Sequence, residues 1–177
     1  MSEQTAGTAG SESTAAAAAT APAAPAGVLP GPDDGVDGVV SRSAVVHTEP
    51  SEIFAFLADA RRHRDLDGSG SVRGPFGGAG KLYLGRKLTI HMAQGWFHYP
   101  VPITITEFDT DRRIAWRHVA GHVWRWTLTP HGPGATLVTE TFDPRPSPFR
   151  KPLSQVGSTN AVGIEATLRG LQERFPG

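Results

Sequence analysis

The sequence contains no cysteine, which excludes disulfide bonds, zinc–thiolate sites, iron–sulfur clusters and thiol nucleophiles. It also lacks a long hydrophobic run. The uncharged stretch 13–32 is mostly Ala, Pro, Thr and Gly, which is too polar to span a bilayer. The first basic residue is Arg42, whereas a secretory signal begins with basic residues. We therefore expect a cytoplasmic protein without a membrane segment.

Net charge is also absent, because 17 Lys and Arg balance 17 Asp and Glu. A neutral chain is a poor candidate for general nucleic-acid binding, so no nucleic-acid partner is predicted. The neutrality hides an uneven distribution. All five charged residues among the first 38 are acidic, and the rest of the chain carries the compensating positive charge.

Residues 1–37 have the composition of a tail. Ala dominates up to residue 26, Pro is frequent, and large apolar side chains are almost missing. Such a segment buries too little apolar surface to offset the entropy of ordering it. We predict a disordered, Ala/Pro-rich acidic tail over 1–37 and a folded domain over 38–177. Deleting residues 1–35 is then expected to change the free energy of unfolding by no more than about 0.5 kcal/mol.

The folded part is mostly strand. Apolar and polar residues alternate with a period of two, and turn residues separate the runs, which is typical of an antiparallel meander with one covered face. The predicted strands are 39–47, 81–93, 97–108, 113–119, 122–129 and 136–143. Two short helices, at 48–59 and 61–67, follow the first strand, and one long helix occupies 152–175.

Several motifs resemble the START-like superfamily, in particular its polyketide-cyclase/dehydrase branch, also called SRPBCC proteins. They are EPSEIF at 49–54, HRDLDGSG at 63–70, IAWR at 114–117, WRW at 124–126 and GATLVTETFD at 134–143. The resemblance implies an α+β helix-grip fold, in which a curved antiparallel sheet of six to seven strands wraps a long C-terminal helix. It also implies a deep cavity between sheet and helix. Members bind lipids, sterols, polyketides or hormones, and a minority catalyse cyclisation or dehydration.

Glu140 is the most informative single residue. It shares a strand face with Val138 and Phe142, so it is expected on the buried side, where a carboxylate is costly unless paired or protonated. It is either a structural partner of an arginine, a residue turned outward by a β-bulge, or a polar anchor or general acid in the cavity. His118 lies on the inward face with Trp116 and is its candidate acid–base partner.

The expected ligand-binding residues follow from strand alternation and the helical stripe. Aromatic residues there provide either core packing or a stacking surface for a planar apolar ligand. The candidates are Ile90, Met92, Ile103, Trp116, Trp126, Val138, Phe142, Gly157, Asn160 and Ile164.

Other motifs do not indicate sites. The Gly-rich segment 74–81 lacks the spacing of a phosphate loop, and a calcium loop starting at Asp65 would have Phe76 where a Glu is needed. His118 and His122 flank a Gly121 turn, and no helical His pair occurs, so no metal site is predicted. His63 is expected in a basic surface run.

These features predict a soluble, cofactor-free binding protein for a small hydrophobic molecule, polyketide-, lipid- or aromatic-like, acting as a monomer or homodimer. Two alternatives remain open. One is a cofactor-independent cyclase or dehydratase that uses Glu140 and His118. The other is an interaction protein resembling the stress-chaperone activators of the same superfamily, with a collapsed cavity and an exposed apolar patch.

Overall fold

The computed structural model describes residues 27–76 and 80–176. In this part of the chain eight strands form one antiparallel sheet in the order β1-β2-β8-β7-β6-β5-β4-β3. The strands are β1 (Leu29–Pro30), β2 (Val40–Val46), β3 (Val72–Pro75), β4 (Lys87–Gln94), β5 (Phe97–Asp109), β6 (Arg113–His118), β7 (Val123–Pro130) and β8 (Thr136–Asp143).

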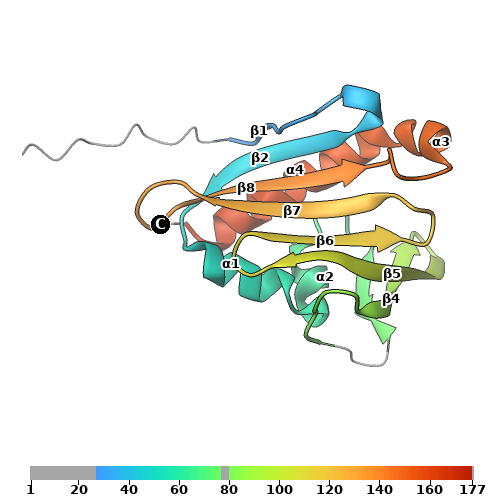
Figure 1. Ribbon diagram of the computed structural model, residues 1–177, viewed down its shortest axis with the longest axis horizontal. Helices are drawn as coiled ribbons and strands as arrows, with labels where there is room; N and C mark the ends of the chain where they lie inside the picture. The colour runs from blue at the N-terminus through green and yellow to red at the C-terminus, as the bar shows by residue number, and fades with distance from the viewer. Residues whose placement is uncertain (1–26, 77–79, 177) are drawn as a thin grey trace, which may run out of the picture.

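The helices lie between and after these strands. They are η1 (Val36–Gly38), α1 (Pro50–Leu57), η2 (Ala60–Arg62), α2 (His63–Leu66), α3 (Arg150–Ser154) and α4 (Gly157–Arg174). Figure 1 shows the sheet curving past α4, which passes behind β2 and β8. The predicted α+β helix-grip architecture is therefore confirmed.

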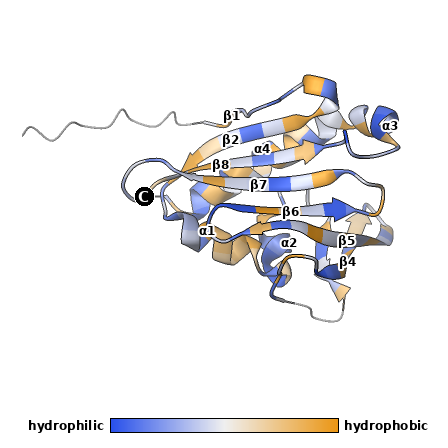
Figure 2. Cartoon of the chain, viewed as in Figure 1, coloured by the Kyte–Doolittle hydropathy of each residue, from blue (hydrophilic) through white to orange (hydrophobic). Residues whose placement is uncertain are grey.

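Side-chain alternation determines which face of the sheet forms the core. Trp126 and Leu128 on β7 are buried, whereas Arg125 and Thr127, on either side of Trp126, are only partly covered. Figure 2 shows this interleaving of apolar and polar residues along the strands. The buried face packs against α4 and α1 through Ile53, Leu57, Ile164, Leu168 and Leu171.

The expected long helix is divided in two. α3 ends at Ser154 and α4 begins at Gly157, because Val156 leaves helical geometry at φ −91° and ψ 8°. The weak helix propensity of glycine at 157 favours this break. Of these two helices, α4 is the one that packs against β2 and β8.

Two strands were not predicted. β1 has only two residues, and β3 contains Gly74 in a left-handed conformation with φ 116° and a register shift beside it. Glycine and proline weaken the alternation by which strands are recognised, so both segments resemble loops in the sequence. They add one short strand to each edge of the predicted sheet.

The domain boundary expected at residue 38 differs from the structure. Residues 1–26 of the predicted tail lie outside the described residues, but residues 29–38 form β1 and η1 and pack along β2. Asp34 Oδ1 accepts a hydrogen bond from the Ser41 backbone N–H at 2.9 Å and lies 2.6 Å from the Arg42 guanidinium. These polar contacts, rather than apolar burial, hold the segment, which explains why composition did not reveal it.

In the part of the chain that the structure describes, no helix is both long and apolar enough to cross a membrane.

Truncation tests the role of this N-terminal segment. Relative to a chain that begins at residue 27, a chain that begins at residue 36 loses β1 and the Asp34 contacts. We expect its free energy of unfolding in urea to fall by about 1.5–3 kcal/mol, the range for hydrogen bonds to a charged group. Asp34→Asn in the longer chain should reproduce part of the loss. Equal unfolding curves for the two truncated chains would show that these contacts do not contribute.

Candidate ligand-binding site

Glu140 lies near the centre of β8, on the face that packs toward α4. It is only 6% exposed, and Val138 and Phe142 on either side of it are fully buried. Across the sheet its register partners are Arg42 on β2 and Trp126 on β7. Its Oε2 atom is buried and has no hydrogen-bond partner among the described residues.

Arg42, the neighbouring cation, does not pair with Glu140. Its guanidinium donates to Glu165 on α4 at 3.1 Å and lies 2.6 Å from Asp34 in the N-terminal segment. It also donates to the Ser41 carbonyl at 2.9 Å. The arginine therefore joins β2, α4 and the N-terminal segment, and within residues 27–76 and 80–176 the buried carboxyl group has no salt-bridge partner.

Asp67 adds a second negative group near Glu140. The loop that carries it lies directly against α4, because the Gly68 N–H donates to Thr167 Oγ1 at 2.9 Å. A Cβ atom at residue 68 would lie 2.3 Å from the Thr167 nitrogen, so the approach requires glycine. Burial, and then the charge of Asp67, raise the pKa of Glu140 well above its ordinary value. The group thus favours its neutral, protonated form.

Trp126 supplies a second unpartnered polar atom beside the first. Its side chain is 3% exposed, and its indole Nε1 has no acceptor among the described residues. Directly opposite residues on one face of an antiparallel sheet have Cβ atoms about 5 Å apart. Buried polar groups are nearly always hydrogen-bonded. Three buried side-chain atoms of the described residues lack a partner, the third being His122 Nδ1, and the two at Trp126 and Glu140 stand out because these residues are directly opposite on neighbouring strands.

A pair of histidines forms a separate cluster at the β6–β7 turn. The rings of His118 and His122 stack with centroids 4.2 Å apart, and His122 lies 5.2 Å from Phe142. Burial, with a smaller contribution from His122, lowers the pKa of His118 to about 3, and burial lowers that of His122 to about 4. Both imidazoles are therefore neutral near pH 7.

The structure does not bring Glu140 and His118 together. Glu140 is in register with Trp126, and Trp126 with Ile114, so His118 lies two strands across and four residues further along. Strand spacing and rise place the two Cα atoms about 16 Å apart. The two residues share a face of the sheet but not a hydrogen-bonding site.

The expectation that His63 lies on the surface was wrong. Its ring is buried, stacks on Trp116 with centroids 5.1 Å apart, and its Nε2 lies 2.8 Å from the Leu57 carbonyl oxygen. Burial lowers its pKa. Leu57, Ala60 and His63 follow a three-residue spacing, and this periodicity was the signal that the basic neighbours concealed.

The other predicted ligand-binding residues divide by burial. Five are buried in the core: Ile90, Ile103, Val138, Phe142 and Ile164. Four are half-buried: Met92, Trp116, Gly157 and Asn160. Met92 and Trp116 pack against the core, and a Cβ at Gly157 would lie 3.4 Å from Val40.

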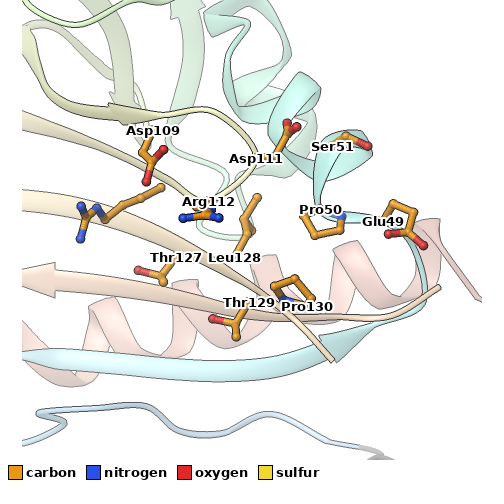
Figure 3. A pocket seen from close by; sticks show the side chains of 11 residues that line it. Glu49, Pro50, Ser51, Asp109, Asp111, Arg112, Thr127, Leu128, Thr129 and Pro130 are labelled. Carbon is orange, nitrogen blue, oxygen red and sulfur yellow. The ribbon is translucent and has the colours of Figure 1, made fainter. Parts of the chain in front are cut away.

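The surface of the described residues is hollowed in two places. The larger, about 650 Å³, opens at the start of α1 beside the β5–β6 turn, where Figure 3 shows acidic side chains and Arg112 around Pro50. The smaller, about 300 Å³, lies between η1, β2 and the start of α4. Gly157 and Arg42 line the smaller one, whereas neither Glu140 nor Trp126 lines either. The predicted interior cavity remains a prediction.

In the described ranges 27–76 and 80–176, no group of three or more His, Asp or Glu side chains is placed to hold a metal ion.

Comparison with known proteins identifies relatives. A family model described as "Polyketide cyclase / dehydrase and lipid transport" matches residues 37–176. An uncharacterized protein, Rv0088, of Mycobacterium tuberculosis is 38% identical over 148 residues, which are 80% of this chain and 66% of that protein. The present chain thus spans slightly less than two thirds of that relative's length.

Solved structures share the fold. A START superfamily protein from Mycobacterium smegmatis superimposes with a TM-score of 0.55 at 17% identity, covering 78% of this chain and 97% of that one. An AHSA1-like protein from Aeromonas hydrophila gives a TM-score of 0.59 at 18% identity, with 77% and 93% covered. At such identities these likenesses concern architecture alone.

The buried carboxyl group of Glu140 should make the stability of the protein depend on pH. A folded-state pKa above the unfolded value of about 4.3 means that folded protein binds more protons, so stability falls as pH rises above that value. Glu140→Gln removes this loss. We expect the stability of the variant relative to wild type to grow above pH 4.5 by up to about 1.4 kcal/mol per pH unit, until the folded-state pKa is passed.

Urea unfolding from pH 4.5 to 8 measures this difference. Glu173→Gln, which changes an exposed carboxylate on α4, is the matched control and should track wild type. A Glu140→Gln curve parallel to wild type at every pH would contradict a buried, neutral Glu140.

Proposed function

The chain belongs to the polyketide cyclase/dehydrase and lipid-transport family, and from this we propose that it binds a small, mostly hydrophobic molecule between the sheet and α4. The ligand class is polyketide-, lipid- or aromatic-like. The START-like fold supports a hydrophobic-ligand or cyclase-like role.

The observation that carries the proposal is the pair of unpartnered polar atoms at Trp126 and Glu140. They lie at the hydrophobic core, where Phe142 is two residues from Glu140 on β8 and Ile114 is opposite Trp126 on β6. A buried polar group without a partner costs about 1–3 kcal/mol, so a protein that only needed a stable core would gain by replacing both. Ligand binding gives these groups a function that offsets the cost.

An enzymatic role is the first alternative. A neutral Glu140 suits a general acid, whereas the His118 imidazole, whose pKa is lowered to about 3, is a weak base near pH 7. Acid–base catalysis needs both groups within reach of one substrate, and the register separates them by two strands and four residues. Binding without reaction therefore has the stronger support.

An interaction protein is the second alternative. Trp96 at the tip of the β4–β5 hairpin is 91% exposed, and Phe97 beside it is also exposed. Such apolar side chains favour contact with another protein. The two functions can be tested separately, because ligand binding depends on residues between the sheet and α4, whereas protein contact depends on this hairpin.

A retained or added ligand tests the binding proposal. We expect native mass spectrometry of freshly purified protein to show a bound small molecule. After its extraction, the neutral fluorescent probe N-phenyl-1-naphthylamine should bind and raise the melting temperature, because a ligand that binds only folded protein stabilises it.

Surface variants distinguish interior binding from adsorption. Trp96→Ser and Val162→Ser remove exposed apolar side chains and should leave probe affinity unchanged. Loss of binding in these variants, or the absence of both retained mass and probe binding in wild type, would contradict the proposal.

Whether the bound molecule is chemically changed by the protein distinguishes binding from catalysis. We expect the co-purified molecule to be recovered unchanged after prolonged incubation with wild type. Glu140→Gln should then alter its affinity by no more than about 1–2 kcal/mol, the worth of one hydrogen bond to a charged or neutral partner. Conversion by wild type, reduced about 10²–10⁴-fold in the variant, would instead establish general acid–base catalysis.

A further inference from the structure

The two unpartnered groups have a defined hydrogen-bonding character. An indole N–H only donates, so Trp126 requires an acceptor atom. A protonated carboxyl group offers one O–H donor, so Glu140 also offers a donor to the same region. The two residues are directly opposite on neighbouring strands, β7 and β8.

The electrostatic surroundings of this pair do not favour an anion. The Arg42 guanidinium is engaged by Glu165 and Asp34. The Asp67 carboxylate lies on the other side, where it accepts hydrogen bonds from the Ser69 and Val72 backbone N–H groups. A negatively charged ligand would meet like charge in an apolar region where the opposing cation, Arg42, is already paired, which is costly.

The surroundings also do not favour a pure hydrocarbon. A ligand without polar atoms would leave both donors without acceptors in the bound state, and a site built to hydrogen-bond an oxygen rejects analogues that lack it. An uncharged oxygen in an apolar frame satisfies both requirements.

We propose that the ligand carries an uncharged carbonyl or hydroxyl oxygen that accepts a hydrogen bond from Trp126 Nε1 and contacts the carboxyl group of Glu140. This inference rests on the proposed function and specifies the ligand class for the same site. Trp126 and Glu140 are its specificity-determining residues, and they discriminate against both hydrocarbons and carboxylates.

The competing explanation is a trapped water molecule that satisfies both groups. A permanently held water would leave the pair indifferent to the ligand, and oxygenated and hydrocarbon molecules would then bind equally well. The comparison of matched ligands distinguishes these cases.

Three naphthalenes of nearly equal shape provide the probes. 2-Acetylnaphthalene has a ketone, 2-isopropenylnaphthalene has a methylene group in place of the ketone oxygen, and 2-naphthoate has a carboxylate. Equilibrium dialysis at pH 7 measures each affinity for the full chain. We expect wild type to bind the ketone about 10- to 100-fold more tightly than the methylene analogue, corresponding to one or two unsatisfied donors, and the carboxylate most weakly.

Variants assign the preference to the two residues. Trp126→Phe and Glu140→Leu should each reduce the ketone-to-methylene ratio several-fold, whereas Glu140→Gln keeps an N–H donor and should retain most of it. Trp124→Phe, which changes an indole two residues along the same strand, is the matched control and should leave the ratio unchanged. Because the ratio compares two ligands on one protein, a moderate loss of stability does not affect it, and the wild-type comparison needs no variant.

Each outcome has one meaning. Equal wild-type affinity for ketone and methylene analogue overturns the inference and leaves the proposed function intact. Carboxylate binding as tight as ketone binding overturns the charge discrimination. Failure of all three probes and of the neutral fluorescent probe overturns the proposed function, and the inference with it.

Discussion

Arg42 makes the interaction on which the rest of the site depends. A cation opposite Glu140 would normally pair with it, and the result would be an ordinary structural ion pair. Two acidic groups from other parts of the chain, Asp34 and Glu165, engage the guanidinium instead. The same contacts that hold the N-terminal segment and α4 to β2 therefore keep the interior carboxyl group free of a counter-ion.

The sequence allowed the architecture to be predicted because the main strands and α4 alternate or repeat clearly. It also revealed Glu140, since a carboxylate on the same buried strand face as Val138 and Phe142 is costly unless it is paired or protonated. The sequence did not show which acidic residues would form ion pairs with Arg42. Asp34 lies in a segment whose composition resembles a tail, and Glu165 lies on a helix whose rotation relative to β2 is set by packing across more than a hundred residues of sequence.

The same reasoning explains the misjudged histidine and the separated acid–base pair. His63 has charged neighbours, and only the three-dimensional course of α2 brings its ring onto Trp116. Glu140 and His118 share an inward face, which alternation correctly implies, but alternation contains no information on register. Register depends on turn lengths and bulges, and here it places the two residues two strands and four residues apart.

The contact at Gly68 limits how the interior can be reached. The loop after α2 lies so close to α4 that even a methyl group would not fit between them, and a hydrogen bond to Thr167 joins the two. On this side loop and helix behave as one unit, so a guest cannot enter by parting them without breaking that contact. The Arg42 side chain joins α4 to β2 by its contact with Glu165, beside a hollow that small residues line together with Asp34, Val39, Val40 and Arg42 itself. A side chain can swing aside more readily than two closely packed backbones can separate, so the proposed binding between sheet and α4 predicts that a ligand enters on the Arg42 side.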